Sequence, residues 1–224
     1  LKYLARASDL APKDASIAYA LGRGFTKRGM LAFAEQAFRN ALRLRPGLPH
    51  ANNALGQLLI QDGRASEAEP YFRAIQGARG FELLAELGLA DSLRIQEKLE
   101  QAVTTYQRAL ALKPDHEAGF EAMIWCTGKL GRGQEVISLL DQRIAEYPEQ
   151  HRWRATRARI RGSNGRHADA AADWKWLTER DPQNPEAAVQ LASALEANGE
   201  FDRATEFADA AVKLAPANAT LGII

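Results

Sequence analysis

Cysteine is nearly absent from this chain, since its 224 residues include only Cys126. A single thiol excludes an internal disulfide framework and leaves the compartment, cytoplasmic or periplasmic, undetermined. The apolar runs are too short to span a bilayer, so we expect no membrane insertion by this chain. A charged and apolar leader is also lacking, and the chain begins with Leu1. We therefore expect it to be a piece of a longer protein.

Catalytic and metal-binding patterns are missing as well. The four histidines show no metal-ligand spacing, and neither a glycine-rich phosphate loop nor a G-x-S-x-G motif is present. Cys126 falls late in a predicted helix, where packing is the expected role of a lone thiol. The sequence therefore predicts no enzyme, no cofactor and no metal site.

Charge is balanced overall but distributed in blocks. The net charge is +1 and the isoelectric point is about 8.1. A domain that binds nucleic acid generally has an isoelectric point above about 9, so we expect no nucleic-acid partner. Basic residues gather in residues 1–46 and 151–167, and acidic residues in 47–150 and 168–224. Alternating blocks indicate recognition by patches or end-to-end contacts, including self-association.

Proline recurs at one position every 34 residues. It stands at Pro12, Pro46, Pro114, Pro148, Pro182 and Pro216, and the one skipped step, position 80, is a glycine. A fixed period of this length indicates one supersecondary unit stacked repeatedly, because a single unit cannot bury its apolar face alone. We number the repeats from residues 15, 49, 83, 117, 151 and 185, which places the proline at repeat position 32.

Small and large residues also recur at fixed repeat positions. Position 20 is small and position 24, one helical turn later, is mostly large. The residues are Ala34, Ala68, Ala102, Val136, Ala170 and Ala204 at position 20, and Phe38, Phe72, Tyr106, Leu140, Trp174 and Ala208 at position 24. Such spacing predicts amphipathic helices that approach closely. Eight side chains are predicted to be buried: Leu21, Phe25, Ala34, Phe38, Leu55, Phe72, Leu89 and Tyr106.

A turn separates two predicted helices in each repeat. Position 15 is glycine in five repeats and Glu97 in the third, which indicates the end of the first helix. Ser66 and Glu69 fit a capping box for a second helix, with Pro70 near its first turn. No segment alternates like a strand. We predict twelve helices in six antiparallel pairs and a lone helix at residues 1–11.

This pattern resembles the tetratricopeptide repeat (TPR), in which small residues, large residues and a terminal proline have the same spacing. The resemblance covers the whole chain and is weakest in the repeats at 117 and 151. It implies an all-α fold, a right-handed α-solenoid of helix–turn–helix repeats. The expected organisation is a second helix of a preceding repeat at 1–14, six repeats at 15–48, 49–82, 83–116, 117–150, 151–184 and 185–218, and a further repeat or tail at 219–224.

The repeat at 151 conflicts with this pattern, because arginines fill positions that should be buried. These are Arg154, Arg157 and Arg161, and burying three guanidinium groups without partners is prohibitive. A shift of the first helix by one residue would resolve the conflict. Trp153, Thr156, Arg157 and Ile160 would then face inward.

The TPR resemblance implies a ligand-binding face. In this family the first helices line a concave groove that holds peptides or protein segments, and repeat positions 2, 5 and 9 face it. The candidate partner-binding residues there are Arg23, His50, Asn53, Gln57, Asp91, Trp125, Arg152 and Arg159. A solvated inner face without a ligand is the alternative. The family's carboxylate clamp and asparagine ladder are not expected, because their lysine and asparagine residues are missing.

Residues 151–167 contain six arginines and no acid. We expect Arg152, Arg154, Arg159 and Arg161 mainly on exposed faces of one short helix. Guanidinium groups bind carboxylates and phosphates bidentately. We therefore predict that an acidic or phosphate-bearing protein segment docks across the repeats at 117 and 151. The alternative is a solvated face neutralised by the acids of adjacent helices: Asp141, Glu146, Glu149, Asp169 and Asp173.

The predicted function is a non-enzymatic scaffold that holds a partner protein segment on the concave face of a TPR superhelix. One alternative is a regulatory or substrate-docking module of a larger glycosyltransferase, sulfotransferase or hydroxylase. Another is a TPR component of bacterial exopolysaccharide assembly. Arginine outnumbers lysine by 21 to 8, which together with frequent alanine indicates a bacterial source.

Overall fold

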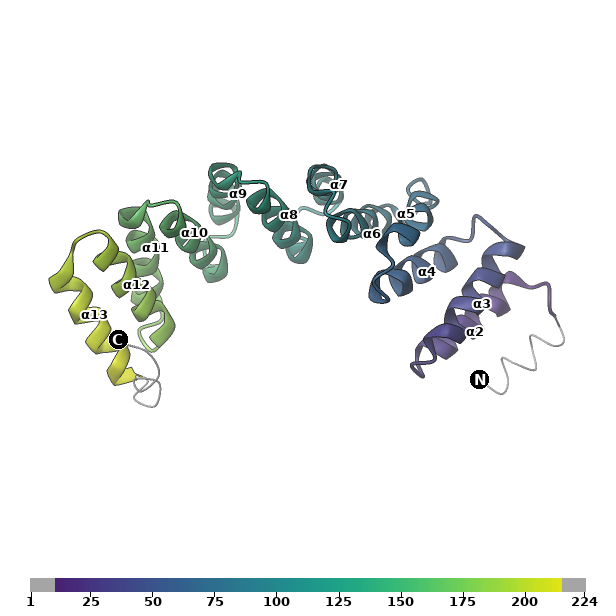
Figure 1. The fold of residues 1–224 in the computed structure, drawn as a ribbon, viewed down its shortest axis with the longest axis horizontal. Helices are drawn as coiled ribbons and strands as arrows, with labels where there is room; N and C mark the ends of the chain where they lie inside the picture. Colours follow the sequence, from purple (N-terminus) through teal and green to yellow (C-terminus); the bar gives the residue numbers. More distant parts are fainter. Residues whose placement is uncertain (1–10, 215–224) are drawn as a thin grey trace. The chain divides into compact units, whose positions relative to one another are not determined.

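The computed structural model describes residues 11–214, and within this range it contains twelve α-helices and no strand (Figure 1). The first helices of the repeats are α2 (Ala15–Thr26), α4 (Pro49–Gln61), α6 (Glu82–Ile95), α8 (Glu117–Lys129), α10 (His151–Ser163) and α12 (Pro185–Ala197). The second helices are α3 (Leu31–Leu44), α5 (Ala65–Arg73), α7 (Leu99–Leu112), α9 (Gly133–Glu146), α11 (His167–Arg180) and α13 (Phe201–Leu214). The predicted all-α repeat solenoid is confirmed. The helix predicted at residues 1–11 and the segment at 219–224 extend outside the described residues.

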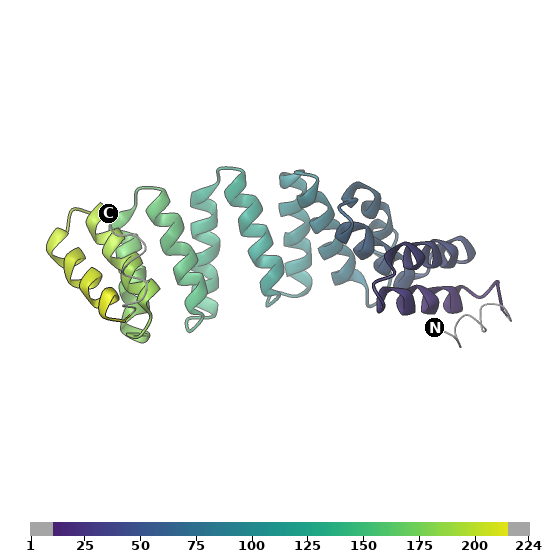
Figure 2. The same cartoon turned by 60° about the horizontal axis from the view of Figure 1, so that its bottom comes forward.

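The chain divides into two compact units, Leu1–Leu130 (unit 1) and Gly131–Ile224 (unit 2). In unit 1, α2 packs on α3, α4 on α5 and α6 on α7, and α7 also contacts α8. In unit 2, α10 packs on α11 and α12 on α13, and α11 also contacts α12 (Figure 2). The repeat predicted at residues 117–150 contributes α8 to unit 1 and α9 to unit 2, so the pairing of these two helices stays a prediction.

The turn between the two helices of a repeat has the same backbone conformation at position 15 throughout. Gly29, Gly63, Gly131, Gly165 and Gly199 have φ between 70° and 82°. Glu97 takes the same left-handed conformation, with φ of 58°, and is the one non-glycine residue of 11–214 that does so. A β-carbon is disfavoured in this conformation, so the third repeat contains local backbone strain.

The capping box predicted at Ser66 and Glu69 is wrong. Helix α5 begins at Ala65 after Arg64, and no side chain caps it. Glu69 instead accepts hydrogen bonds from Arg73, a residue of the next turn. Pro70 lies inside the helix and not near its first turn. The helix ends at Arg73, and residues 74–81 form turns at the step where the recurrent proline is missing.

The predicted core is mostly confirmed. Ala34, Phe38, Leu55, Phe72, Leu89 and Tyr106 are buried. Leu21 and Phe25 are only partly buried, so the prediction is wrong for these two residues.

Phe72 of α5 lies against two glycines on the neighbouring first helices. A β-carbon at Gly56 would lie 2.6 Å from Cζ of Phe72, and one at Gly88 would lie 2.2 Å from its Cε1. Because both distances are shorter than van der Waals contact, the ring fits only where α4 and α6 lack side chains at these two points.

Candidate functional site

Arg157 and Arg161 of α10 enter the interior of unit 2, where Asp173 of α11 binds both. Arg157 Nε donates to Asp173 Oδ2 at 2.9 Å, and Arg161 Nη1 donates to the same oxygen at 2.7 Å. Arg157 also bonds to Asp141 of α9. The exposed fractions are 12% for the Arg157 side chain, 15% for Arg161 and 4% for Asp173. This is a buried ion cluster in which each guanidinium group has a carboxylate partner.

The one-residue shift predicted for the first helix of this repeat is therefore wrong. Helix α10 occupies repeat positions 1–13, as α8 and α12 do, and Ala158 at position 8 is fully buried. Burial lowers the pKa of Arg157, but the hydrogen bonds that it donates to Asp173 and Asp141 outweigh this effect and leave the pKa raised. Arg157 stays charged inside the pair because these acids replace its hydration. The expectation that Arg161 lies on an exposed face is wrong for the same reason.

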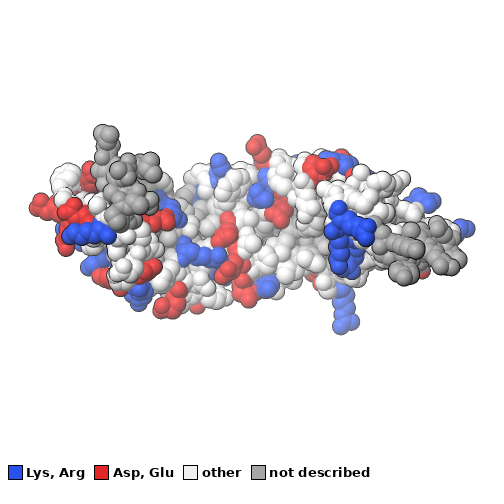
Figure 3. Space-filling view, turned by 90° about the horizontal axis from the view of Figure 1, so that it is seen from below, with Lys and Arg blue, Asp and Glu red and all other residues white. Residues whose placement is uncertain are grey.

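Arg152 and Arg159, the two candidates in unit 2, line one pocket of about 200 Å³ between α10, α11 and the start of α12. Trp174 and Leu177 give it an apolar wall. Asp181 and Glu186 line it too, and Arg159 Nη2 donates to Glu186 Oε1 at 2.9 Å. The pocket therefore contains charges of both signs. Acidic and basic side chains are likewise interspersed on the face of each unit seen in Figure 3.

The first-helix candidates Arg23 and His50 lie in a row of rings in unit 1. The His50 ring is 5.8 Å from that of Tyr19 and 4.8 Å from that of Phe81, measured between centroids. The guanidinium carbon of Arg23 lies 5.9 Å from the Tyr19 centroid. Arg23 and His50 are exposed, so the row offers aromatic surface to a ligand.

Asn53 and Gln57 lie one and two turns further along α4, and both are partly buried. The Asn53 side-chain oxygen is inaccessible to solvent and has no hydrogen-bond partner. A buried acceptor without a donor destabilises the protein unless another group binds it. Asn53 is thus a polar group with a free hydrogen-bonding capacity, one turn after His50 on α4.

Asp91 and Trp125 lie in a second group of side chains in unit 1. Tyr106 donates its hydroxyl proton to Asp91 Oδ1 at 2.6 Å, and Arg94 Nε donates to the Tyr106 oxygen at 3.2 Å. Burial and then the Asp91 charge raise the pKa of Tyr106, so the phenol stays protonated. Trp125 is 47% exposed, and Arg94 and Lys129 both lie against its ring, at 5.8 and 5.5 Å from the centroid.

The sequence interpretation missed Arg94 and Lys129 in this group. They stand at repeat positions 12 and 13, at the end of the first helices. Lys129 was detectable, because residues four apart on a helix share a face and Trp125 precedes it by four. Arg94 reaches Trp125 from the neighbouring first helix, a contact that one repeat considered alone does not reveal.

Six candidates lie in unit 1 and two in unit 2. Because Trp125 belongs to unit 1, and Arg152 and Arg159 to unit 2, a ligand docked across the repeats at 117 and 151 stays a prediction. Cys126 is buried, and burial raises the pKa of its thiol, which disfavours the nucleophilic thiolate.

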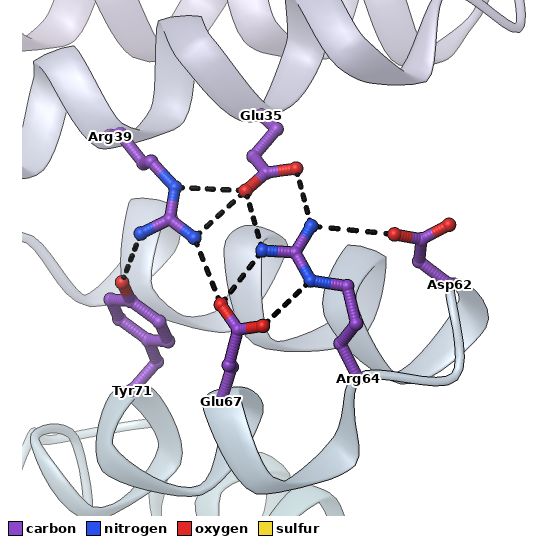
Figure 4. A network of polar contacts seen from close by, with 6 residues as sticks. All are labelled: Glu35, Arg39, Asp62, Arg64, Glu67 and Tyr71. Atoms are coloured by element: carbon purple, nitrogen blue, oxygen red, sulfur yellow. Dashed lines mark hydrogen bonds and ion pairs between the residues drawn. The ribbon is translucent and has the colours of Figure 1, made fainter.

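A separate polar network links second helices in unit 1 (Figure 4). Arg64 donates to Glu35 at 2.9 Å and to Glu67 at 2.7 Å, and Arg39 donates to Glu35 at 2.8 Å. The hydrogen bond from Arg64 is the main cause that lowers the pKa of Glu35 and that of Glu67. Since its members satisfy one another and join consecutive repeats, this network has a structural role.

Two further searches cover only the described part of the chain. Residues 11–214 contain no group of three or more His, Cys, Asp or Glu side chains that could hold a metal ion. No helix of this part has the length and apolar character needed to cross a membrane.

These features define a protein built of stacked helical repeats. The chain belongs to the tetratricopeptide repeat family, since the family's sequence profile, Tetratricopeptide repeat, matches residues 19–82, 53–117 and 156–219. TPR repeats imply a protein-interaction scaffold. No curated protein matches the sequence.

Solved structures show the same fold at low sequence identity. A tetratricopeptide repeat protein from Parabacteroides merdae ATCC 43184 has a TM-score of 0.67 at 15% identity, covering 92% of this chain and 87% of that one. pilF of Pseudomonas aeruginosa has a TM-score of 0.60 at 16% identity, covering 90% and 92%. YrrB, described as a TPR protein with an unusual peptide-binding site, has a TM-score of 0.55 at 17% identity, covering 95% and 92%.

Proposed function

We propose that the protein is a non-enzymatic scaffold, and that unit 1 binds an extended segment of a partner protein along the first-helix face of α2, α4 and α6. The single observation that carries this proposal is the buried, unpartnered oxygen of Asn53. Because Asn53 as a whole is only partly buried, rotation of its amide can turn this oxygen outward, where a backbone N–H of an extended segment can donate to it.

The surroundings of Asn53 support this assignment. His50, one turn before Asn53 on α4, contacts the rings of Tyr19 and Phe81, and this row offers apolar surface to a side chain of the segment. Leu84 of α6 is 41% exposed and provides a second apolar contact. Aromatic surface next to a free polar acceptor favours a peptide over a small polar ligand.

The experiment uses twelve-residue peptides selected from a random display library with the wild-type protein. Asn53→Ala should weaken the selected peptides about tenfold, because one buried hydrogen bond is lost. Gln107→Ala is the matched control, since this residue is exposed on α7, a second helix. If both substitutions weaken peptide binding equally, or if neither changes it, the assigned face is refuted.

The pocket in unit 2 supports a second candidate, an acidic protein segment. Arg152 and Arg159 line one pocket, and Arg159 already donates a hydrogen bond to a carboxylate of the same chain, Glu186. Glu186→Gln should therefore strengthen the binding of an acidic peptide, whereas Arg152→Glu with Arg159→Glu should weaken it at least about tenfold without changing circular dichroism. Glu179→Gln on α11 is the control, and a Glu186→Gln variant that behaves like it would contradict this candidate.

The sequence also left open a docking module of a larger enzyme and a component of exopolysaccharide assembly. In either setting we propose that the same first-helix face of unit 1 is used.

A further inference from the structure

Trp176 of α11 is contacted by two arginines from different helices of unit 2. The guanidinium carbon of Arg154, from α10, lies 4.0 Å from the centroid of the Trp176 ring, and that of Arg180, from α11, lies 3.8 Å from it. The ring itself packs on the apolar core of the unit. His151 meets the ring edge at 5.4 Å between centroids, with the planes at 89°.

These two arginines differ from their neighbours in their partners. Arg157, Arg159 and Arg161 each bind a carboxylate. Within residues 11–214, neither Arg154 nor Arg180 forms an ion pair, and the Arg154 Nε atom is buried without a hydrogen-bond partner. Their positive charges are therefore held close together with no carboxylate bound to either.

The electrostatic surroundings agree with this geometry. Burial lowers the pKa of Arg154, and the charges of Arg157 and Arg180 lower it further. Asp173 and Glu149 oppose that effect only through their charges, without a hydrogen bond to Arg154. The nearest exposed acid on the same helix, Glu179, lies 3.5 Å from Lys175.

Stacking on an indole fixes the plane of a guanidinium group and leaves the N–H groups at its edge free. Two such groups on one ring give several preorganised donors within one small region. An acceptor with three oxygens and close to two negative charges matches this arrangement better than a carboxylate does.

We propose that Arg154 and Arg180, held by Trp176, form a binding site for a phosphomonoester group. The site is distinct from the unit 1 face and from the pocket of Arg152 and Arg159, so it does not rest on the proposed function. A phosphorylated side chain of a protein and a free phosphate ester share this chemistry.

The experiment measures the binding of three probes by calorimetry at low ionic strength: inorganic phosphate, N-acetyl-phosphoserine amide and N-acetyl-glutamate amide. We expect the phosphoserine probe to bind about tenfold more tightly than the glutamate probe, and Arg180→Gln to weaken it about tenfold. Arg180 is exposed, so this variant should fold as the wild type does. Arg154→Gln should give the same loss, with thermal melting as the check on its folding.

Lys175→Gln is the matched control, because it removes one exposed positive charge of α11 next to Trp176. If Arg180→Gln and Lys175→Gln weaken phosphoserine equally, the arginines act only through general charge and the site is refuted. Equal affinity for the glutamate and phosphoserine probes would refute the phosphate assignment. If Arg180→Gln weakens phosphoserine binding, the two phosphate probes distinguish the origin of the bound group. Tighter binding of phosphoserine than of inorganic phosphate supports a phosphorylated protein, and equal binding supports a free ester.

Discussion

Repeat positions 7 and 11 are filled in opposite ways in α4 and α6 of unit 1 and in α10 of unit 2. In unit 1 they are Leu55 and Leu59 of α4, and Leu89 and Leu93 of α6, all buried. In α10 of unit 2 they are Arg157 and Arg161, which bind Asp173. Helix bounds and the burial of repeat position 8 are retained in both cases. The backbone of this repeat therefore accepts either hydrocarbon or a closed ion cluster in its interior.

The two kinds of interior should lose stability in different ways when a side chain is replaced. An aliphatic interior loses stability in proportion to the volume removed. An ion cluster stabilises only while every charge keeps its partner, because the loss of one partner leaves another charge buried and unpaired. The α10–α11 pair should therefore be more sensitive to a single change of charge than the pairs of unit 1.

The largest effect is expected from Asp173→Ala. It leaves two buried guanidinium groups with only the half-exposed Asp141, and should lower the free energy of unfolding by about 3–5 kcal/mol. Urea denaturation monitored by circular dichroism measures it. Asp141→Ala is the milder counterpart, since 48% of that side chain is exposed.

A second test replaces the ion cluster of unit 2 with apolar side chains. Replacing Arg157, Arg161 and Asp173 together with leucine would convert the α10–α11 interior to the unit 1 type. Stability should then be retained or should rise, because a well-packed apolar group avoids desolvation of the ions. If the triple variant is as unstable as Asp173→Ala, the interior between α10 and α11 cannot pack leucine in place of the charged side chains.

A smaller loss is expected in unit 1 from Gly88→Ala. The added β-carbon would meet Phe72 at 2.2 Å, and such overpacking should lower the free energy of unfolding by about 1–3 kcal/mol. Gly128→Ala is the control, because a β-carbon there meets nothing within 4 Å. Equal melting temperatures of the two variants would contradict the tight packing of the aliphatic interior.

A modest gain is expected from Glu97→Gly at the turn of the third repeat. Glycine relieves the left-handed backbone of this residue at φ of 58°, although it also increases the entropy of the unfolded chain. The net stabilisation should be about 1 kcal/mol. Thermal melting tests it, with Gly63→Glu as the reverse change at the same turn of the second repeat. A lower melting temperature for Glu97→Gly would show that Glu97 is not strained.

The smallest effect should come from acid acting on the exposed network of unit 1. The hydrogen bond from Arg64 lowers the pKa of Glu35, so this carboxylate stabilises the fold above its unfolded pKa of about 4.3. That contribution to stability is lost as the pH falls through the lowered pKa of the folded state. Glu35→Gln should flatten the acid side of the stability profile by less than about 1 kcal/mol. Glu206→Gln is the control, and an identical profile for both would exclude a role of the network.

The 34-residue period predicted the helices and most of the core, because spacing alone determines which residues share a helical face. It could not predict the register of α10. Arg157 and Arg161 are unfavourable in a buried position unless an acid is recognised as their partner, and Asp173 lies on the next helix at a repeat position that is Ala37 or Tyr71 elsewhere.

The candidate face was predicted only in part for a related reason. Positions 2, 5 and 9 located His50, Asn53 and Trp125 on first helices. The residues that contact them stand at other repeat positions. Phe81, which contacts His50, precedes α6, and Arg94, which contacts Trp125, lies at the end of α6. Lateral contacts between consecutive repeats depend on how the helices pack, which the pattern within one repeat does not contain.

The position of Phe72 between Gly56 and Gly88 has a consequence for how unit 1 opens. The ring belongs to the second repeat, yet it is buried equally against the first helix of the third. Neither repeat can detach without exposing this ring to water, so the two should unfold as one cooperative element. Native-state hydrogen exchange should then show a shared opening free energy for the amides of α4 and α6.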